Sequence, residues 1–174
     1  MEDDPDVAYL YYRVLIDRGH TVTIASTAEQ CLKVYSEKLY RARMKENIFR
    51  DIQPYDAVIL DYKMADRNGV EVAKEIQSIN PYQRIIFVSA LIEEWFDSIR
   101  GLKSPVEFLQ KPVANKKLID TVEQTEVFKE LESLNVDTEA FKQARFSPQV
   151  LKEIIVLIRK SQIQKRLPDE VNYC

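Results

Sequence analysis

The stretch Tyr55-Asp56-Ala57-Val58-Ile59-Leu60-Asp61-Tyr62-Lys63-Met64 indicates a short strand that ends in a carboxylate. Its apolar residues, 57–60, are continuous rather than alternating, which is typical of an interior parallel strand that helices cover on both faces. Open sheets of this kind place their chemistry at the C-terminal ends of the strands, and Asp61 occupies that position. Taken alone, Asp61 could equally end the strand by capping a turn. The rest of the chain has to decide between these two interpretations.

The composition excludes several classes of function. The chain has 174 residues, enough for one domain and an appendage, and its net charge of −3 offers no basic field for nucleic acid. Its three glycines form neither a P-loop nor a dinucleotide-binding pattern. Cys31, Cys174 and the single histidine, His20, do not make a metal cluster, so we expect thiols in a reduced setting. No signal peptide or long apolar run is present, which predicts a cytoplasmic protein without a membrane partner.

Helix-start signals and apolar periodicity predict an alternating series of helices and strands up to residue 124. Pro5, a capping box of Ser26 and Glu29, Asn68, and Asn115 mark helix starts. The expected helices cover residues 5–18, 26–53, 69–79, 91–102 and 115–124, and the expected strands cover 21–25, 57–61, 84–89 and 106–110. The third helix is expected to face the core with Val72, Ala73, Ile76 and Ile79. This alternation predicts an α/β fold, a doubly wound parallel sheet of four to five strands.

Residues 125–174 are helical in pattern throughout, and we expect them to form a C-terminal extension to a domain of residues 1–124. Asp137 and Ser147-Pro148 are helix-start signals. The apolar stripe within residues 150–158 is too broad for a helix that packs on one side only, so it predicts an interaction surface for a homodimer or another protein. Acidic and basic residues are equally numerous, which favours a solvated helix end over a nucleic-acid patch at residues 159–166.

Three further polar features accompany Asp61. Glu2-Asp3-Asp4 precedes the first helix, Ser89 ends the strand after the Asp61 strand, and Lys111 ends the strand after that. Parallel strands present their C-terminal ends on one rim, so these groups should converge. The set suits phosphoryl transfer to a carboxylate. A divalent cation held by carboxylates neutralises the incoming phosphoryl group, while an ammonium and a hydroxyl hold its remaining oxygens.

In order and spacing, these features resemble the receiver domain of two-component response regulators over about residues 2–124. The matching elements are Glu2-Asp3 with Pro5, Asp61 with Met64 and Gly69, Ser89-Ala90, and Lys111-Pro112. The resemblance implies that Asp61 accepts phosphate from a histidine kinase or a phosphotransfer protein. It also implies that Mg²⁺ is bound by Glu2, Asp3, Asp61 and the backbone carbonyl of Lys63.

The same resemblance also implies which residues contact the phosphate and respond to it. Ser89 would be the switch hydroxyl, Lys111 the phosphate-contacting lysine with a cis bond to the following proline, and Phe108 the rotating switch aromatic. Lys63 and Leu91 would flank the path of the water that removes the phosphate. Neither side chain accepts a hydrogen bond from water, so any autodephosphorylation is expected to be slow.

The chain departs from the family at its start, where only Met1 precedes Glu2. The missing first strand would lie between the 21–25 strand and the Asp61 strand. Either the chain is truncated or the sheet closes without that strand, and in both cases Glu2 and Asp3 are expected on a frayed terminus. If this disables the acidic pocket, the protein is a receiver-like interaction module that is not phosphorylated. An aspartyl-phosphate hydrolase of the haloacid dehalogenase type fits less well, because it needs a second Asp where this chain has Lys63.

Overall fold

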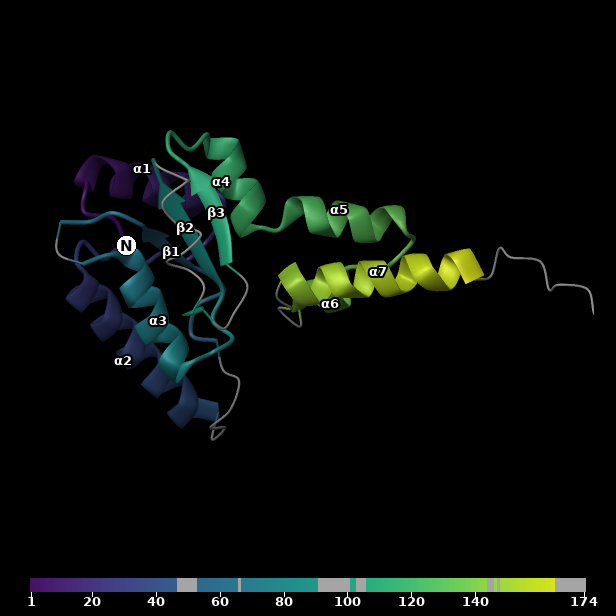
Figure 1. The fold of residues 1–174 in the computed structure, drawn as a ribbon, viewed down its shortest axis with the longest axis horizontal. Helices are drawn as coiled ribbons and strands as arrows, with labels where there is room; N and C mark the ends of the chain where they lie inside the picture. The colour runs from purple at the N-terminus through teal and green to yellow at the C-terminus, as the bar shows by residue number, and fades with distance from the viewer. Residues whose placement is uncertain are drawn as a thin grey trace, which may run out of the picture. The chain divides into compact units, whose positions relative to one another are not determined.

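A parallel sheet forms the centre of the first part of the chain (Figure 1). Its strands are β1 (Val58–Asp61), β2 (Ile85–Ser89) and β3 (Val106–Gln110), in the spatial order β1-β2-β3. This computed structural model describes residues 1–46, 53–65, 67–90, 101–102, 106–143, 146 and 148–164. The chain divides into two compact units, Met1–Val122 and Glu123–Cys174. The domain boundary expected at residue 124 stays a prediction.

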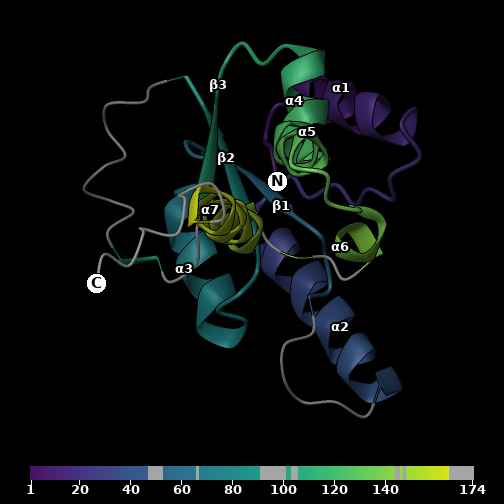
Figure 2. The ribbon, with the colours of Figure 1, turned by 90° about the vertical axis from the view of Figure 1, so that its right-hand side faces the viewer.

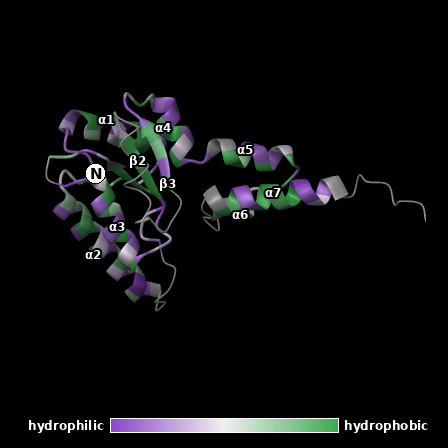
Figure 3. Cartoon of the chain, viewed as in Figure 1, coloured by the Kyte–Doolittle hydropathy of each residue, from purple (hydrophilic) through white to green (hydrophobic). Residues whose placement is uncertain are grey.

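The continuous apolar runs form strands that are buried on both faces, as predicted. All five side chains of β2 are buried. Successive side chains of a strand point to opposite faces. Accordingly, Ile85 and Phe87 enter one hydrophobic core, whereas Ile86 and Val88 enter the other. The hydrophobic colour of the sheet in Figure 3 reflects this two-sided burial.

Helices cover both faces of the sheet (Figures 1 and 2). On one face, α2 (Ala28–Glu46) and α3 (Gly69–Ile79) enclose the core that contains Phe87. On the other face, α1 (Pro5–Ile16) and α4 (Asn115–Val122) supply Leu15 and Leu118 to the core that contains Val88. The predicted doubly wound α/β architecture is therefore confirmed.

The predicted number of strands is wrong, because the described residues form three strands rather than four or five. Residues 21–25 are extended but do not form a strand. Met1 and Glu2 lie between them and β1: the Met1 nitrogen donates to the Ile59 carbonyl, Asp61 N–H donates to the Met1 carbonyl, and Glu2 N–H donates to the Ala25 carbonyl. Two residues are too few to extend the ladder. Their backbone hydrogen bonds nevertheless hold Glu2 in place, so the terminus is not frayed as expected.

The helix starts agree with the sequence signals at three positions and differ at one. Asp4 caps α1 ahead of Pro5, and Asn68 caps α3, each through a side-chain oxygen that accepts backbone N–H groups. The predicted Ser26–Glu29 capping box is shifted by one residue. Thr27 Oγ1 accepts the Gln30 N–H, and the Gln30 side chain accepts the Ser26 N–H. The helix predicted to start at Asn115 begins at that residue.

Two expectations about the helices need correction or fall outside the described residues. Ile79, predicted to face the core, is exposed, because it ends α3 beyond the buried residues Val72, Ala73 and Ile76. The predicted extension of the second helix, residues 40–53, is confirmed up to residue 46, and residues 47–52 lie outside the described residues. Most of the predicted 91–102 helix also lies outside them.

A buried polar network fastens α2 to the segment between α3 and β2. The Tyr35 hydroxyl donates to Gln83 Oε1 at 3.1 Å and accepts from Asn80 Nδ2 at 3.0 Å. Gln83 Nε2 donates to the Tyr55 carbonyl at 2.8 Å. Burial raises the pKa of Tyr35 to about 12. Because buried polar groups are costly when unpaired, this network fixes the position of the chain that enters β1 and β2.

We expect Tyr35→Phe to lower the free energy of unfolding by about 1–2 kcal/mol near neutral pH, since it leaves the Gln83 side-chain oxygen without its phenol donor. A tyrosine whose folded-state pKa is raised contributes stability that is fully present below the ordinary value of 10 and is lost as the pH rises toward 12. The difference between wild type and variant should shrink accordingly. Urea unfolding across this pH range measures it, with Tyr40→Phe, exposed on the same helix, as control. Equal stability of wild type and Tyr35→Phe would contradict the prediction.

The second unit contains α5 (Thr125–Ser133), α6 (Glu139–Gln143) and α7 (Pro148–Gln164). Leu131 of α5 packs against Leu151 and Ile155 of α7, and these three side chains are buried. An ion pair of 2.8 Å between Arg159 and Glu130 links the same two helices. The helical pattern read from residues 125–174 is confirmed for the described part of this region.

Candidate functional site

The C-terminal ends of the three strands bring the predicted polar residues to one rim. Asp61 is the last residue of β1 and is in register with Val88, so Ser89 follows one step further along β2. The Lys111 N–H donates to the Ser89 carbonyl at 2.7 Å, which places Lys111 directly beyond β3. Both Asp61 and Ser89 are buried. The structure thus places all three residues on the rim that the sequence predicts.

The Lys111 ammonium lies between two carboxylates. Its Nζ atom is 2.7 Å from Asp61 Oδ2 and 3.0 Å from Glu2 Oε1, so it bonds both groups. The side chains of Asp61 and Glu2 are only 7% and 6% exposed, whereas that of Lys111 is 24% exposed. Charge-assisted hydrogen bonds in such partly dry surroundings are strong. This arrangement fixes the Asp61 carboxylate in one orientation.

Glu2, Asp3 and Asp61 offer carboxylate oxygens that all lie within 4.8 Å of one another. Glu2 Oε2 is buried and lies 2.9 Å from Lys111 Nζ, so both oxygens of this carboxylate face the ammonium. Asp3 Oδ2 accepts the Ala65 N–H at 3.1 Å, which holds this exposed carboxylate beside the loop after β1. Oxygen ligands from several carboxylates fit a hard divalent cation such as Mg²⁺.

The electrostatics of the rim also favour a cation. Burial raises the pKa of the Glu2 carboxyl, and the negative charge of Asp61 adds to this effect against the opposing hydrogen bond from Lys111. Burial alone would lower the pKa of Lys111, but its hydrogen bonds to Asp61 and Glu2 outweigh it, so the pKa lies above its ordinary value. One ammonium therefore faces two carboxylates, with Asp3 adjacent. The excess negative charge is what a bound cation would neutralise.

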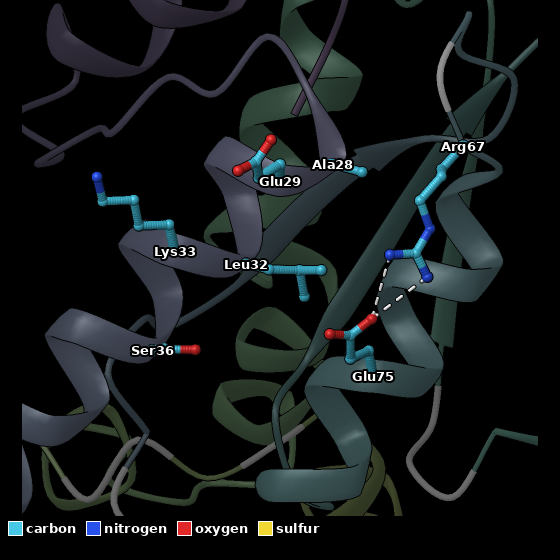
Figure 4. Close-up of a pocket in the computed structure, with 7 residues that line it drawn as sticks. All are labelled: Ala28, Glu29, Leu32, Lys33, Ser36, Arg67 and Glu75. Atoms are coloured by element: carbon cyan, nitrogen blue, oxygen red, sulfur yellow. Dashed lines mark hydrogen bonds and ion pairs between the residues drawn. The ribbon is translucent and has the colours of Figure 1, made fainter.

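The loop between β1 and α3 is fixed from both ends. At Gly69, a Cβ atom would lie 2.2 Å from the Asp61 carbonyl oxygen, and the Gly69 N–H donates to the Tyr62 carbonyl at 3.0 Å. Arg67 reaches back from the loop to α3, where it pairs with Glu71 at 3.3 Å. It also pairs with Glu75 at 3.3 Å, as Figure 4 shows. These contacts hold the backbone next to Asp61 in place.

Two residues near the rim were missed by the sequence analysis. Arg67 borders a groove of about 570 Å³ between α2 and α3, whose other lining residues include Leu32 and Lys33. Tyr11 of α1 is close enough to the rim for Lys111, Glu2 and Asp61 to influence its pKa, which burial raises. No local signal set Tyr11 apart from the other apolar residues of α1, or Arg67 apart from other surface arginines.

The remaining predicted residues occupy distinct positions around the rim. Phe108 of β3 is half-buried and stacks on Phe87 with ring centroids 5.6 Å apart. Lys63 is exposed, and its N–H donates to Asp61 Oδ1 at 3.3 Å. The Lys111–Pro112 peptide bond is cis, as predicted. Leu91 lies outside the described residues.

Comparison with known families matches residues 1–123 to the response regulator receiver domain. This chain belongs to that family. The Sensory/regulatory protein RpfC of Xanthomonas campestris is 29% identical over 116 residues, which is 63% of this chain and 14% of RpfC. The chain therefore spans only a small part of the length of the curated relatives that it matches.

Solved receiver structures share the fold. A CheY-like receiver domain protein from Methanospirillum hungatei superimposes with a TM-score of 0.55 at 19% identity, over 75% of this chain and 93% of that one. The receiver domain of the histidine kinase CKI1 from Arabidopsis thaliana, solved with Mg²⁺ and BeF₃⁻, superimposes with a TM-score of 0.58 at 19% identity. The match covers 71% of this chain and 86% of that one. Among the described residues, the receiver and its extension contain no helix with the length and apolarity that a bilayer crossing requires.

Proposed function

We propose that this receiver domain accepts a phosphoryl group on Asp61. The observation that carries the proposal is the position of the Asp61 carboxylate, which is buried at a strand end, 2.7 Å from the Lys111 ammonium and beside Glu2 and Asp3. An Asp61 oxygen attacks the phosphorus atom of the donor, and the bond between phosphorus and the donor atom breaks. The donor keeps the electron pair of that bond and takes up a proton. Asp61 thereby becomes an acyl phosphate.

Glu2, Asp3, Asp61 and the backbone carbonyl of Lys63 are the groups that would hold Mg²⁺. The fit rests on the carboxylate oxygens of Glu2, Asp3 and Asp61, which lie within 4.8 Å of one another. When bound, the cation supplies positive charge that offsets the repulsion between the carboxylate and the phosphoryl oxygens.

Phosphorylation is proposed to change the conformation of the domain through three residues, Lys111, Ser89 and Phe108. Lys111 already bonds Asp61, so its flexible ammonium can transfer to a phosphoryl oxygen with little movement. Ser89 ends the neighbouring strand and would donate its hydroxyl to another phosphoryl oxygen. Phe108, which stacks on Phe87, would change its packing in response. The donor is proposed to be a histidine kinase or a phosphotransfer protein, as family membership supports.

Incubation with acetyl phosphate and Mg²⁺, followed by intact mass measurement, tests the proposal. We expect the mass of one phosphoryl group to be added, and we expect chelation of Mg²⁺ or substitution of Glu2→Gln to reduce the yield at least tenfold. Asp61→Asn should abolish the gain. Asp56→Asn is the matched control, because Asp56 precedes the same strand but is exposed and lies away from its C-terminal end. A folded protein that gains no phosphate would favour the receiver-like interaction module instead.

A further inference from the structure

An exposed apolar stripe runs along α7 beside the side that packs in its own core. Leu151, Ile155 and Ile158 face the core of the second unit. Val150 and Leu157, in contrast, are 37% and 64% exposed. Figure 3 shows the hydrophobic colour that extends along much of this helix. Exposed apolar side chains on one helix side indicate a surface that another element can cover.

The stripe has the spacing of a helix that packs against a second helix. Val150, Ile154, Leu157 and Ser161 follow one another at intervals of four, three and four residues, which is the seam of a coiled coil. Ile154 is half-buried and packs against the core of the second unit, so the seam shares this residue with that core. The seam therefore continues the apolar face of α7 around the helix rather than forming an isolated patch.

The two borders of this seam differ in charge. On one border lie Leu151 and Ile158, which belong to the intramolecular core. On the other border lie Glu153 and Lys160, seven residues apart and both exposed. These two residues correspond to the flanking positions that set partner choice and orientation in coiled coils. When two such helices run antiparallel along this border, the acidic residue of each helix lies opposite the basic residue of the other.

We infer that α7 pairs with α7 of a second copy of this chain, in antiparallel orientation. In this arrangement, Leu157 of each copy packs on Ile154 of the other. Glu153 of each copy then lies opposite Lys160 of the other. The contact is isologous, so both ion pairs form together and the assembly closes at a dimer. A parallel arrangement places Glu153 and Lys160 opposite core-facing residues and forms neither pair, which is why the charge pattern selects the antiparallel one.

The expected dimer is weak and reversible, because the seam is short and the ion pairs are exposed. Exposed pairs typically contribute less than about 1 kcal/mol each. Small interfaces of this kind belong to transient complexes. We therefore expect dimer formation between about 10 µM and 1 mM protein. The dimer does not depend on phosphorylation of Asp61, so the two proposals can fail separately.

Sedimentation equilibrium of the full chain over this concentration range tests the inference. Leu157→Glu should leave the protein monomeric. Glu153→Lys and Lys160→Glu should each weaken dimerisation about tenfold, since each replaces two attractions by two repulsions. The double reversal, Glu153→Lys with Lys160→Glu, should restore the dissociation constant to within about threefold of wild type, since both pairs reform with exchanged partners. Lys152→Glu, exposed on α7 but outside the seam, is the matched control.

Three results would overturn the inference. These are a wild-type protein that stays monomeric up to about 1 mM, a dimer that Leu157→Glu leaves unchanged, and a double reversal that is no better than the single ones. Circular dichroism of each variant distinguishes lost association from lost folding, because the substituted side chains are exposed and the helix content should not change. Asp61→Asn should dimerise like wild type.

Discussion

Replacing Gly69 with alanine is expected to destabilise the receiver domain by about 3 kcal/mol, the upper part of the range for overpacked sites. A Cβ atom at Gly69 would lie 2.2 Å from the Asp61 carbonyl oxygen and 3.1 Å from its carbonyl carbon. Both atoms belong to the backbone of β1, so the clash cannot be relieved by rotating a side chain. Either α3 or the end of β1 has to move. Each movement stretches the hydrogen bond from Gly69 N–H to the Tyr62 carbonyl.

The substitution should therefore affect function as well as stability, since the displaced backbone is that of the proposed phosphoacceptor. We expect phosphorylation by acetyl phosphate to slow at least tenfold under conditions in which the variant remains folded. Gly101→Ala is the matched control, because a Cβ atom there would meet only the Lys74 side chain at 3.5 Å, an ordinary contact distance. Urea unfolding measures the stability. If Gly69→Ala unfolds and reacts like Gly101→Ala, the close approach does not position Asp61.

The sequence predicted the layered fold because a continuous apolar run is a direct signal of a strand that is buried on both faces. Residues such as Ile85–Val88 are apolar without interruption, and only a strand covered on both sides needs that pattern. Residues 21–25, predicted as a strand, include similar β-branched residues but lack a partner strand of sufficient length. Strand formation depends on the neighbouring strand as much as on local propensity.

The site was predictable to the extent that topology fixes it. Asp61, Ser89 and Lys111 each end a parallel strand, and the ends of such strands share one rim whatever the details of packing. The two hydrogen bonds of the Lys111 ammonium, to Asp61 and to Glu2, could not be predicted from the sequence, because they depend on the path of the segment that precedes α1. The one-residue shift of the capping box has a similar origin. Ser26, Thr27, Glu29 and Gln30 are all suitable capping residues, and only the path of the chain into α2 selects between the two registers.

Arg84 shows most clearly what a sequence pattern leaves out. It precedes the apolar run of β2, where a charged residue is usually solvated, yet it is buried. Its guanidinium bonds Glu107 of β3 at 2.6 Å and donates to the carbonyls of Thr121 and Val122 at 2.5 and 2.9 Å. These carbonyls are at the C-terminal end of α4, where helix carbonyls lack intrahelical partners. One side chain therefore ties β2 and β3 to the last helix of the receiver unit.

Substitution of Arg84→Met should lower the free energy of unfolding by about 3 kcal/mol. Removal of one member of a buried ion pair costs about 3–5 kcal/mol, and we place the expectation at the lower limit because the Glu107 side chain is 30% exposed and can recover some hydration. The loss of two helix-end hydrogen bonds acts in the same direction. Arg84→Lys should recover only part of the stability, because a single ammonium cannot reproduce the forked geometry that reaches three partners.

Urea unfolding followed by circular dichroism measures the stability of each variant. Arg67→Met is the matched control: Arg67 also pairs with two carboxylates, but its side chain is 41% exposed, so the substitution should leave the stability close to that of wild type. The double variant Arg84→Met, Glu107→Met separates the two causes of the loss. It removes the unpaired Glu107 carboxylate but does not restore the hydrogen bonds at the end of α4. We therefore expect it to recover roughly half of the stability lost in Arg84→Met. An Arg84→Met protein as stable as Arg67→Met would show that the buried guanidinium is not what joins α4 to the sheet.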